Sequence, residues 1–294
     1  MGVIDALNEG FRIVVRKPVL LSIPILLDLV LLVSPKPSLS QFMLGVGGID
    51  ADGAQALGAL VSAILLLLVA LHVPSLGAGA TSDFGGLGGA VELTGGGAVF
   101  GWAPVLLLIG VIISTAYLGL LRRTIYPEPE EPQLAALIMD RAPHLLGLAA
   151  LAVVSLLGLI FLFVLAAAFM GFVAIFVGMA VAVGLIAIPF LLFFANLSVI
   201  VDGSSPRGAI RRSIEFISGD AWPVAGIIIL TVVVQLIAGI VLTAIIGNAV
   251  GFAVAVAANA FIGTVLAAGS MVFYLSRTYD VEFSHEVSND GTDW

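Results

Sequence analysis

The sequence predicts an all-α integral membrane protein with six transmembrane helices, built as three repeats of an interfacial helix followed by a hairpin. Three observations carry this prediction. The 294 residues are 61% hydrophobic and 10% charged, with a mean hydropathy of +1.21, which is more apolar surface than a soluble core of this size buries. Six apolar runs approach or exceed the roughly 20 residues that cross a bilayer. The basic residues collect on one side of these runs.

The six predicted spans occupy Val19 to Val33, Phe100 to Leu121, His144 to Ala168, Gly171 to Val201, Trp222 to Ile246 and Gly251 to Leu275. The first run is short and contains Pro24 and Asp28. Its basic start and short apolar core imitate a secretory signal. We interpret it as retained, because it belongs to the first repeat.

A seventh run, Leu57 to Pro74, is placed by the distribution of charge. Lys and Arg favour the cytoplasmic side of short loops, and six spans leave only Lys36 outside. If the seventh run also crossed, Arg122 and Arg123 would move outside unless another span were lost. We therefore expect an external, re-entrant or interfacial helix here. The alternative is that this run spans and the first does not. Both termini are expected in the cytoplasm and the protein in the plasma membrane.

The repeat is visible in three segments. Each consists of an amphipathic stretch, a short polar segment, a proline and an apolar run: "LNEGFRIVVRKPVLLSIPILL", "LAALIMDRAPHLLGLAALAV" and "AIRRSIEFISGDAWPVAGIIIL". Their prolines are Pro18, Pro143 and Pro223. The predicted units cover about 1–125, 126–203 and 204–280, within one transmembrane domain of 1–280. A glycine-rich external insertion covers about 35–97, and the acidic tail 281–294 is expected to be disordered.

The third interfacial helix is the best defined. Asp202 and Gly203 predict a turn, Ser205 an N-cap, Pro206 the first helical residue and Gly219 the end. Ile210, Ile214 and Ile217 then share one face, and the arginines lie on the other, where Arg211 and Glu215 form an i,i+4 pair. We expect basic residues of the three interfacial helices to anchor topology and meet anionic lipid headgroups. These residues are Arg12, Arg16, Lys17, Arg141, Arg207, Arg211 and Arg212.

The run "LLFFANLSVIVDGSSPRGAIRRSIEFISGDAWPV", followed by "VFYLSRTYD", resembles the six-helix membrane domain attached to some glycerophosphodiester phosphodiesterases and also found alone. An acidic residue and Gly, then Ala and a basic residue before Ser, recur in that family. They correspond here to Asp202, Gly203, Ala209, Arg211 or Arg212, and Ser213. The resemblance implies the fold only, because the family's phosphodiesterase activity belongs to a separate soluble barrel, for which this chain leaves no room.

Polar and small residues inside the predicted spans are further candidates. Polar groups in membrane runs often mark pathways or join helices, and the candidates here are Asp28, Asn196, Gln235 and Asn259. A stripe of small residues on the last span allows another helix to approach closely, and we expect that helix to belong to the same chain. The stripe comprises Gly251, Ala255, Gly263 and Ala267.

The sequence lacks the common motifs of catalytic, metal-binding and phosphate-binding sites. The sequence contains no nucleophile elbow, zinc-binding helix motif or phosphate-binding loop, so we expect no catalytic, cofactor or metal site. A net charge of −8 argues against nucleic acid as a partner. We expect a non-catalytic module that binds lipids or a protein partner, either another membrane protein or a second copy of this chain. The alternative is a transporter or channel for a lipid or other hydrophobic molecule, with an intramembrane lipid-headgroup enzyme less favoured.

Overall fold

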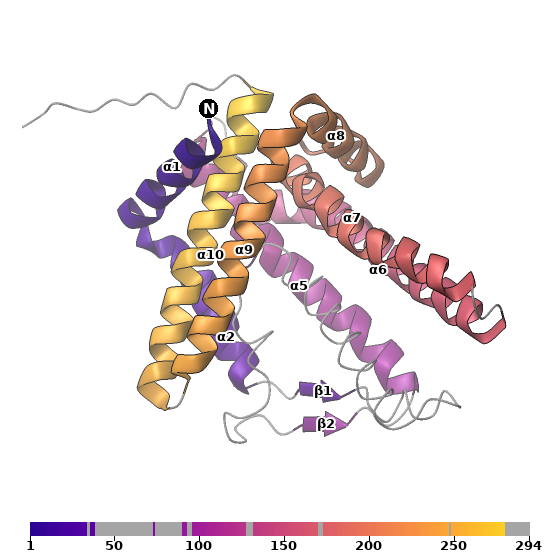
Figure 1. Ribbon diagram of the computed structural model, residues 1–294. Coiled ribbons are helices and arrows are strands. Elements are labelled where there is room, and N and C mark those ends of the chain that lie inside the picture. Colours follow the sequence, from indigo (N-terminus) through magenta and orange to yellow (C-terminus); the bar gives the residue numbers. More distant parts are fainter. Residues whose placement is uncertain are drawn as a thin grey trace, which may run out of the picture.

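The computed structural model describes residues 1–33, 36–38, 73, 90–92, 96–127, 132–169, 173–246 and 248–279, and within these it is an all-α bundle with a pair of very short strands (Figure 1). The elements are α1 (Val3–Arg16), a 3₁₀ turn (Pro18–Leu21), α2 (Ser22–Val33), β1 (Lys36–Ser38), β2 (Ala90–Glu92), α5 (Gly96–Ile125), α6 (Leu134–Phe169), α7 (Val173–Asp202), α8 (Pro206–Gly219), α9 (Ala221–Ile245) and α10 (Ala249–Thr278).

Four segments are long and apolar enough to cross a membrane: Leu107–Ile125, Leu134–Leu159, Ala221–Leu242 and Val250–Thr278. They belong to α5, α6, α9 and α10. Two shorter apolar segments, Pro18–Leu29 and Phe190–Asp202, coincide with the remaining two predicted spans. The structure is therefore that of a helical protein with four candidate membrane spans.

The predicted external insertion is described only in small part. Its ends include β1 and β2, which pair in parallel with Lys36 opposite Ala90. No strand was predicted here, and a parallel pair requires a long connection between its strands, which residues 39–89 provide. The predicted helix at Leu57 to Pro74, except for the buried Val73, and the predicted 281–294 tail lie outside the described residues.

Two of the predicted interfacial helices pack on the helix that precedes them in the sequence, and the first packs on the last helix described. The start of α6 packs against α5, where a Cβ on Gly119 would lie 2.8 Å from Leu137 Cδ2. Helix α8 packs against α7, and the Ser213 hydroxyl donates to the Leu191 carbonyl at 2.6 Å. Helix α1 packs against α10, the last helix described (Figure 1). The N-terminal helix is thus docked on the opposite end of the chain.

The α1–α10 crossing depends on two glycines. A Cβ on Gly10 would lie 2.5 Å from the Gly269 nitrogen, and a Cβ on Gly269 would lie 2.7 Å from Leu7 Cδ2 and 3.0 Å from Leu7 Cα. These distances are too short for real side-chain atoms, so the backbones meet directly. Ala6 and Val14 are completely buried on the same face of α1, whereas Phe11 packs edge-on against Phe261 with 5.7 Å between ring centroids.

Proline 143 does not end a helix, contrary to the layout predicted from the repeat. Helix α6 runs through it from Leu134 to Phe169, although an internal proline removes a backbone hydrogen bond. Leu137, Leu145 and Leu148 are buried on either side of it, and their spacing places them on one helical face. Continuous packing along this face offsets the missing hydrogen bond.

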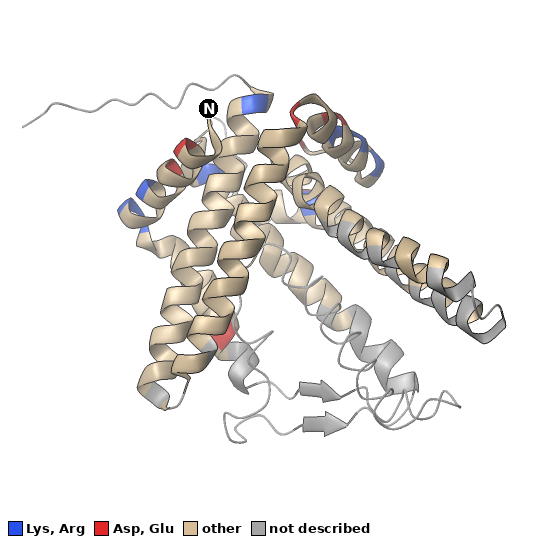
Figure 2. Ribbon diagram, viewed as in Figure 1, with Lys and Arg blue, Asp and Glu red and all other residues tan. Residues whose placement is uncertain are grey.

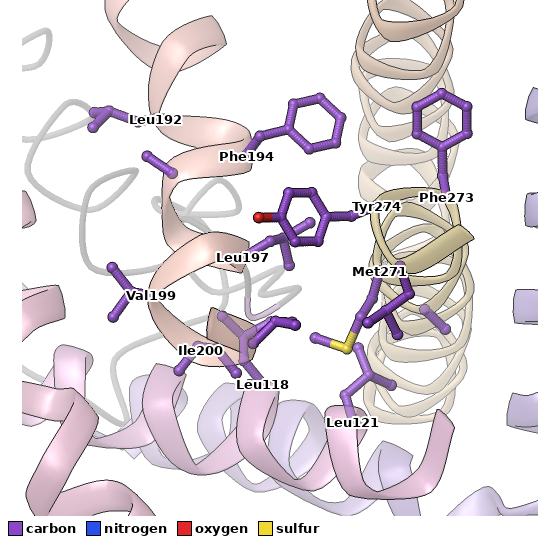
Figure 3. Close-up of a cluster of buried hydrophobic side chains, with 14 of the residues drawn as sticks. Leu118, Leu121, Leu192, Phe194, Leu197, Val199, Ile200, Met271, Phe273 and Tyr274 are labelled. Atoms are coloured by element: carbon purple, nitrogen blue, oxygen red, sulfur yellow. The ribbon is translucent and has the colours of Figure 1, made fainter. Parts of the chain in front are cut away.

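The apolar core lies where α5, α7 and α10 meet (Figure 3). Helix α7 contributes Phe194, Leu197 and Ile200, α5 contributes Leu118 and Leu121, and α10 contributes Met271, Phe273 and Tyr274. These side chains are at most 1% exposed. Away from this junction the α6–α7 hairpin projects away from the α9–α10 pair (Figure 1). The described helices are therefore joined most closely at the end where most of their charged residues lie (Figure 2).

Candidate functional site

The best-defined polar cluster of the described chain surrounds the carboxylate of Asp202, at the end of α7. The Tyr274 hydroxyl donates to Oδ2 at 2.6 Å, and Arg212 Nε lies 3.1 Å from the same oxygen. The Tyr279 hydroxyl donates to Oδ1. The side chain of Asp202 is 4% exposed. This carboxylate therefore joins the ends of α7 and α10 to α8.

Two serines extend the cluster. Ser198 Oγ lies 3.0 Å from Asp202 Oδ2 and 3.0 Å from Ser204 Oγ. A hydroxyl has one proton and a carboxylate oxygen only accepts, so Ser198 donates to Asp202 and Ser204 donates to Ser198. Because Ser198 and Asp202 are four residues apart, they share a face of α7. The cluster is thus a connected chain of hydrogen bonds that ends at the carboxylate.

The turn after Asp202 requires glycine for two reasons. Gly203 has a φ of +70°, which only glycine adopts without strain. A Cβ at this position would also lie 1.4 Å from Arg141 Nη1, so the Arg141 guanidinium occupies the volume that a side chain would fill. Helix α6 reaches this turn because Gly147 lets it approach Pro206, the first residue of α8.

The residues quoted above between Asp202 and Ser213 have structural roles in these contacts. Arg212, not Arg211, pairs with Asp202; Arg211 points outward and pairs with Glu215 at 2.8 Å. Ala209 and Ser213 are buried against α7. Helix α8 therefore faces the core with Ala209 and Ser213 rather than with a face centred on Ile214, which is 48% exposed. The predicted N-cap Ser205, the start at Pro206 and the end at Gly219 are confirmed.

A second contact closes the bundle at the same end. Arg277 Nη1 lies 2.5 Å from Asp220 Oδ2, Nη2 donates to the Met1 carbonyl at 3.3 Å, and the guanidinium stands over the Phe273 ring. Asp220 separates α8 from α9. The end of α10 therefore holds both the start of the chain and the α8–α9 connection.

The cluster changes the acid–base behaviour of Tyr279. Burial of its hydroxyl, followed by the hydrogen bond to Asp202 and the negative charge of that residue, raises the pKa of Tyr279 to about 12. The positive charges of Arg212 and Arg122 oppose this effect. The hydroxyl of Tyr279 therefore holds its proton more tightly than that of an ordinary tyrosine.

The chemistry open to Asp202 follows from its partners. The carboxylate of Asp202 accepts hydrogen bonds from three hydroxyls and forms an ion pair with the Arg212 guanidinium, so most of the roughly four positions at which a carboxylate accepts are occupied. Asp202 therefore has little capacity left to accept a proton from a substrate. In the part of the chain that the structure describes, no three His, Cys, Asp or Glu side chains are grouped to hold a metal ion. The arrangement is that of a structural junction.

The predicted anchor residues divide into two kinds. Arg12 lies 3.7 Å from Glu9, and Arg16, Lys17, Arg207 and Arg211 are exposed. Arg141 and Arg212 instead lie at the α7–α8 turn. Figure 2 shows Lys and Arg on α1, α8 and the end of α10, at one end of the molecule.

The predicted intramembrane polar residues differ in how deeply they are buried. Asp28, Asn196 and Asn259 are buried on α2, α7 and α10, whereas Gln235 is exposed on α9. Gln235 lies beside two exposed apolar residues of α9, Leu236 and Ile237.

The small-residue stripe serves two separate purposes. A Cβ on Gly251 would lie 2.2 Å from the Ile245 carbonyl, so Gly251 permits the tight α9–α10 connection, where Asn248 caps α10. Ala255 is buried in a small cluster with Ala238 and Leu242 of α9. Gly263 is buried and Ala267 is partly buried on α10. The helix that Ala255 meets belongs to the same chain.

Four members of the Asp202 cluster were not singled out from the sequence: Ser198, Ser204, Tyr274 and Tyr279. The four-residue spacing of Ser198 and Asp202 was a usable signal. The tyrosines had only the segment "YLSRTYD" to mark them, since they lie 72 and 77 residues from Asp202. Comparisons with protein-family models, curated proteins and solved structures found no match.

Proposed function

We propose that this protein is a non-catalytic, multi-pass membrane scaffold whose basic end binds anionic lipids. The supporting observation is the combination of exposed apolar and basic side chains on the interfacial helices. Ile4 is 78% exposed beside the basic face of α1, and Trp222, which follows α8, is 89% exposed. Tryptophan is enriched where a membrane meets water, and basic residues at that level attract anionic headgroups.

The proposal uses six spans in three units, with both termini in the cytoplasm. Helices α2 and α7 add to the four long candidate spans, and the cyclic packing of α1 on α10, α6 on α5 and α8 on α7 supports a repeated unit. We also propose that the chain shares the fold of the phosphodiesterase-associated membrane domain. The Asp202–Arg212 pair supports this, because it gives the shared motif a structural role.

A scaffold is favoured over an enzyme because three hydroxyls and the Arg212 guanidinium already contact the carboxylate of Asp202. It is favoured over a carrier by the exposed position of Gln235, which separates this residue from the buried Asp28 and Asn259.

Native mass spectrometry of the protein extracted with its own lipids tests the proposal. We expect anionic phospholipids to be retained in preference to zwitterionic ones, because the basic residues gather at one end. Retention without preference for charge would contradict lipid binding at the basic end. A stoichiometric neutral ligand that survives delipidation would favour the carrier instead, and a co-purifying membrane protein without lipid would favour a partner scaffold.

A further inference from the structure

Two arginines flank the turn between α7 and α8 with unused hydrogen-bond donors. Arg212 contacts Asp202 through Nε, and Arg141 contacts Asp140 through Nε at 3.1 Å. Among the residues that the structure describes, neither guanidinium has a further polar partner for its two terminal amino groups. We refer to Arg141 and Arg212 as the arginine pair.

The two guanidiniums lie at adjacent positions of one turn. Arg141 Nη1 occupies the side-chain volume of Gly203, and Arg212 contacts the carboxylate of Asp202. The Cα atoms of consecutive residues are about 3.8 Å apart. The side chain of Arg141 is 21% exposed and that of Arg212 is 42% exposed, so both are held in place while part of each reaches solvent.

The charge of the arginine pair is incompletely neutralised. Asp202 also accepts hydrogen bonds from Tyr274 and Tyr279, and the side chain of Asp140 is 65% exposed, which weakens its effect on Arg141. A partly desolvated guanidinium binds most tightly to an anion that accepts several parallel hydrogen bonds from it.

The turn lies at the level where lipid phosphates are found. Helix α7 ends at Asp202, and the candidate span of α10 ends at Thr278. The hydrogen bond from Tyr279 to Asp202 holds these two helix ends together. If α7 and α10 cross the bilayer as proposed, their joined ends mark its surface, where the phosphate groups of lipids lie.

We propose that the arginine pair at the Asp202–Gly203 turn binds a phosphate group, supplied by the headgroup of an anionic lipid such as a phosphomonoester lipid or by free phosphate. The proposal rests on the proposed lipid-binding function and makes it specific to one site. Planar guanidinium groups donate two parallel hydrogen bonds to phosphate oxygens, whereas lysine acts as a single point charge. Binding at this site therefore depends on arginine itself as well as on positive charge.

The test is a titration of the full chain with dioleoylphosphatidic acid, followed by native mass spectrometry in a zwitterionic detergent. Dioleoylglycerol has the same acyl chains without phosphate and serves as the ligand control. Arg141→Lys keeps the positive charge of the site but removes the planar guanidinium group, which can donate two parallel hydrogen bonds. Arg12→Lys makes the same exchange on α1, away from the turn. Thermal unfolding of each variant checks that it remains folded.

We expect the wild type to prefer phosphatidic acid over dioleoylglycerol. Arg141→Lys should weaken binding of phosphatidic acid roughly tenfold, as for the loss of one charge-assisted hydrogen bond. Arg12→Lys should weaken binding less than Arg141→Lys does, because it keeps the surface charge and lies away from the turn. If Arg141→Lys is unstable, Arg212→Lys is the second variant, with the same expected loss.

Inorganic phosphate added to the same titration distinguishes the sources. If millimolar phosphate displaces the lipid, the arginine pair is a site for free phosphate. If it does not, the arginine pair is a site for a lipid headgroup. Either result supports phosphate binding by the arginine pair. Equal binding by the wild type and both Lys variants overturns the site but leaves general binding of anionic lipids intact. A wild type without preference for phosphatidic acid over dioleoylglycerol overturns the site and the proposed function together.

Discussion

At the α7–α8 turn, the Asp202 carboxylate is held by donors from α7, α8 and the end of α10. Few side chains in the described chain connect so many elements. An exposed ion pair of the same chemical kind, Arg211 with Glu215, lies on the outer face of α8. Comparing the buried carboxylate of Asp202 with the exposed carboxylate of Glu215 therefore separates the effect of burial on stability from the effect of charge.

Replacing Asp202 by Asn should reduce the free energy of unfolding by about 1–3 kcal/mol, because the amide cannot accept from all four donors and one of its own protons faces them. Equilibrium unfolding in detergent, followed by circular dichroism, measures the change. Glu215→Gln makes the same carboxylate-to-amide exchange at an exposed site and should have no measurable effect. Equal effects of both variants would show that Asp202 is not a structural junction.

The raised pKa of Tyr279 predicts a loss of stability at alkaline pH. The folded protein holds the tyrosine proton more tightly than the unfolded chain does, with a pKa of about 12 against about 10 for an ordinary tyrosine. This contribution to stability is therefore complete below pH 10 and disappears between about pH 10 and 12. Tyrosinate absorbance at 295 nm measures the titration, and subtracting the curve of Tyr279→Phe isolates this residue. A difference curve centred near pH 10 would contradict the hydrogen bond to Asp202.

At the scale of elements, α1 packs closely against another helix of the bundle. Gly10 and Gly269 bring the backbones of α1 and α10 together, and the Met1 carbonyl accepts a hydrogen bond from Arg277. A helix that only rested on the lipid surface would need neither glycine.

Gly10→Ala should therefore destabilise the fold by about 1–3 kcal/mol, as overpacking does, because the new methyl group would meet the backbone of α10. The measurement is thermal unfolding in detergent. Gly158→Ala is the matched control, since a Cβ on Gly158 of α6 has nothing within 4 Å. It should be neutral within about 0.5 kcal/mol. If Gly10→Ala is as stable as this control, α1 does not pack on α10 through its glycine.

Much of the element layout was predictable because local rules decide it. The apolar runs predicted helices, and the N-cap, first proline and final glycine of α8 were predicted residue by residue. Arg211 and Glu215 pair as their spacing predicted. The path of α6 through Pro143 and the burial of Ser213 depend on packing partners, which periodicity does not identify. The same holds for Asp202, whose tyrosine partners lie far away in the sequence.

At the scale of the whole molecule, the two halves of the bundle meet at its basic end and diverge from it. Helix α10 contacts α5 and α7, and α8 contacts α9, whereas the α6–α7 hairpin extends away from α9 and α10 (Figure 1). Polar contacts at the α7–α8 turn and at Arg277 thus hold together helices that carry long exposed apolar faces, including those of Phe161 and Ile240. Lipid is the environment that such faces require.

The six-span arrangement predicts the side from which each connection is accessible. The chain contains no cysteine, so single cysteines can be introduced without a background. Gln133→Cys and Ser218→Cys should react with an impermeant maleimide only from the cytoplasmic side, and Gly171→Cys only from outside. Intact cells and inverted vesicles provide the two orientations. Labelling of Gly171→Cys and Ser218→Cys from the same side would show that α7, which lies between them, does not cross the membrane.

The same cysteine-free chain tests the Leu57 to Pro74 run. Asp52→Cys and Ser82→Cys lie on either side of it and should both react from outside if the run does not cross. Opposite accessibility would show that it spans, in agreement with the alternative in which the first apolar run does not.

The docking of α1 on α10 has a consequence for biosynthesis. Gly10 and its partner Gly269 are about 260 residues apart in the sequence, and ribosomes add ~5–20 residues per second. Helix α1 therefore waits on the order of 10 to 50 s before its binding face on α10 exists. During that interval its apolar face is open to the insertion machinery and to chaperones, so the contact that Gly10 makes with Gly269 forms only after the α10 segment has been synthesised.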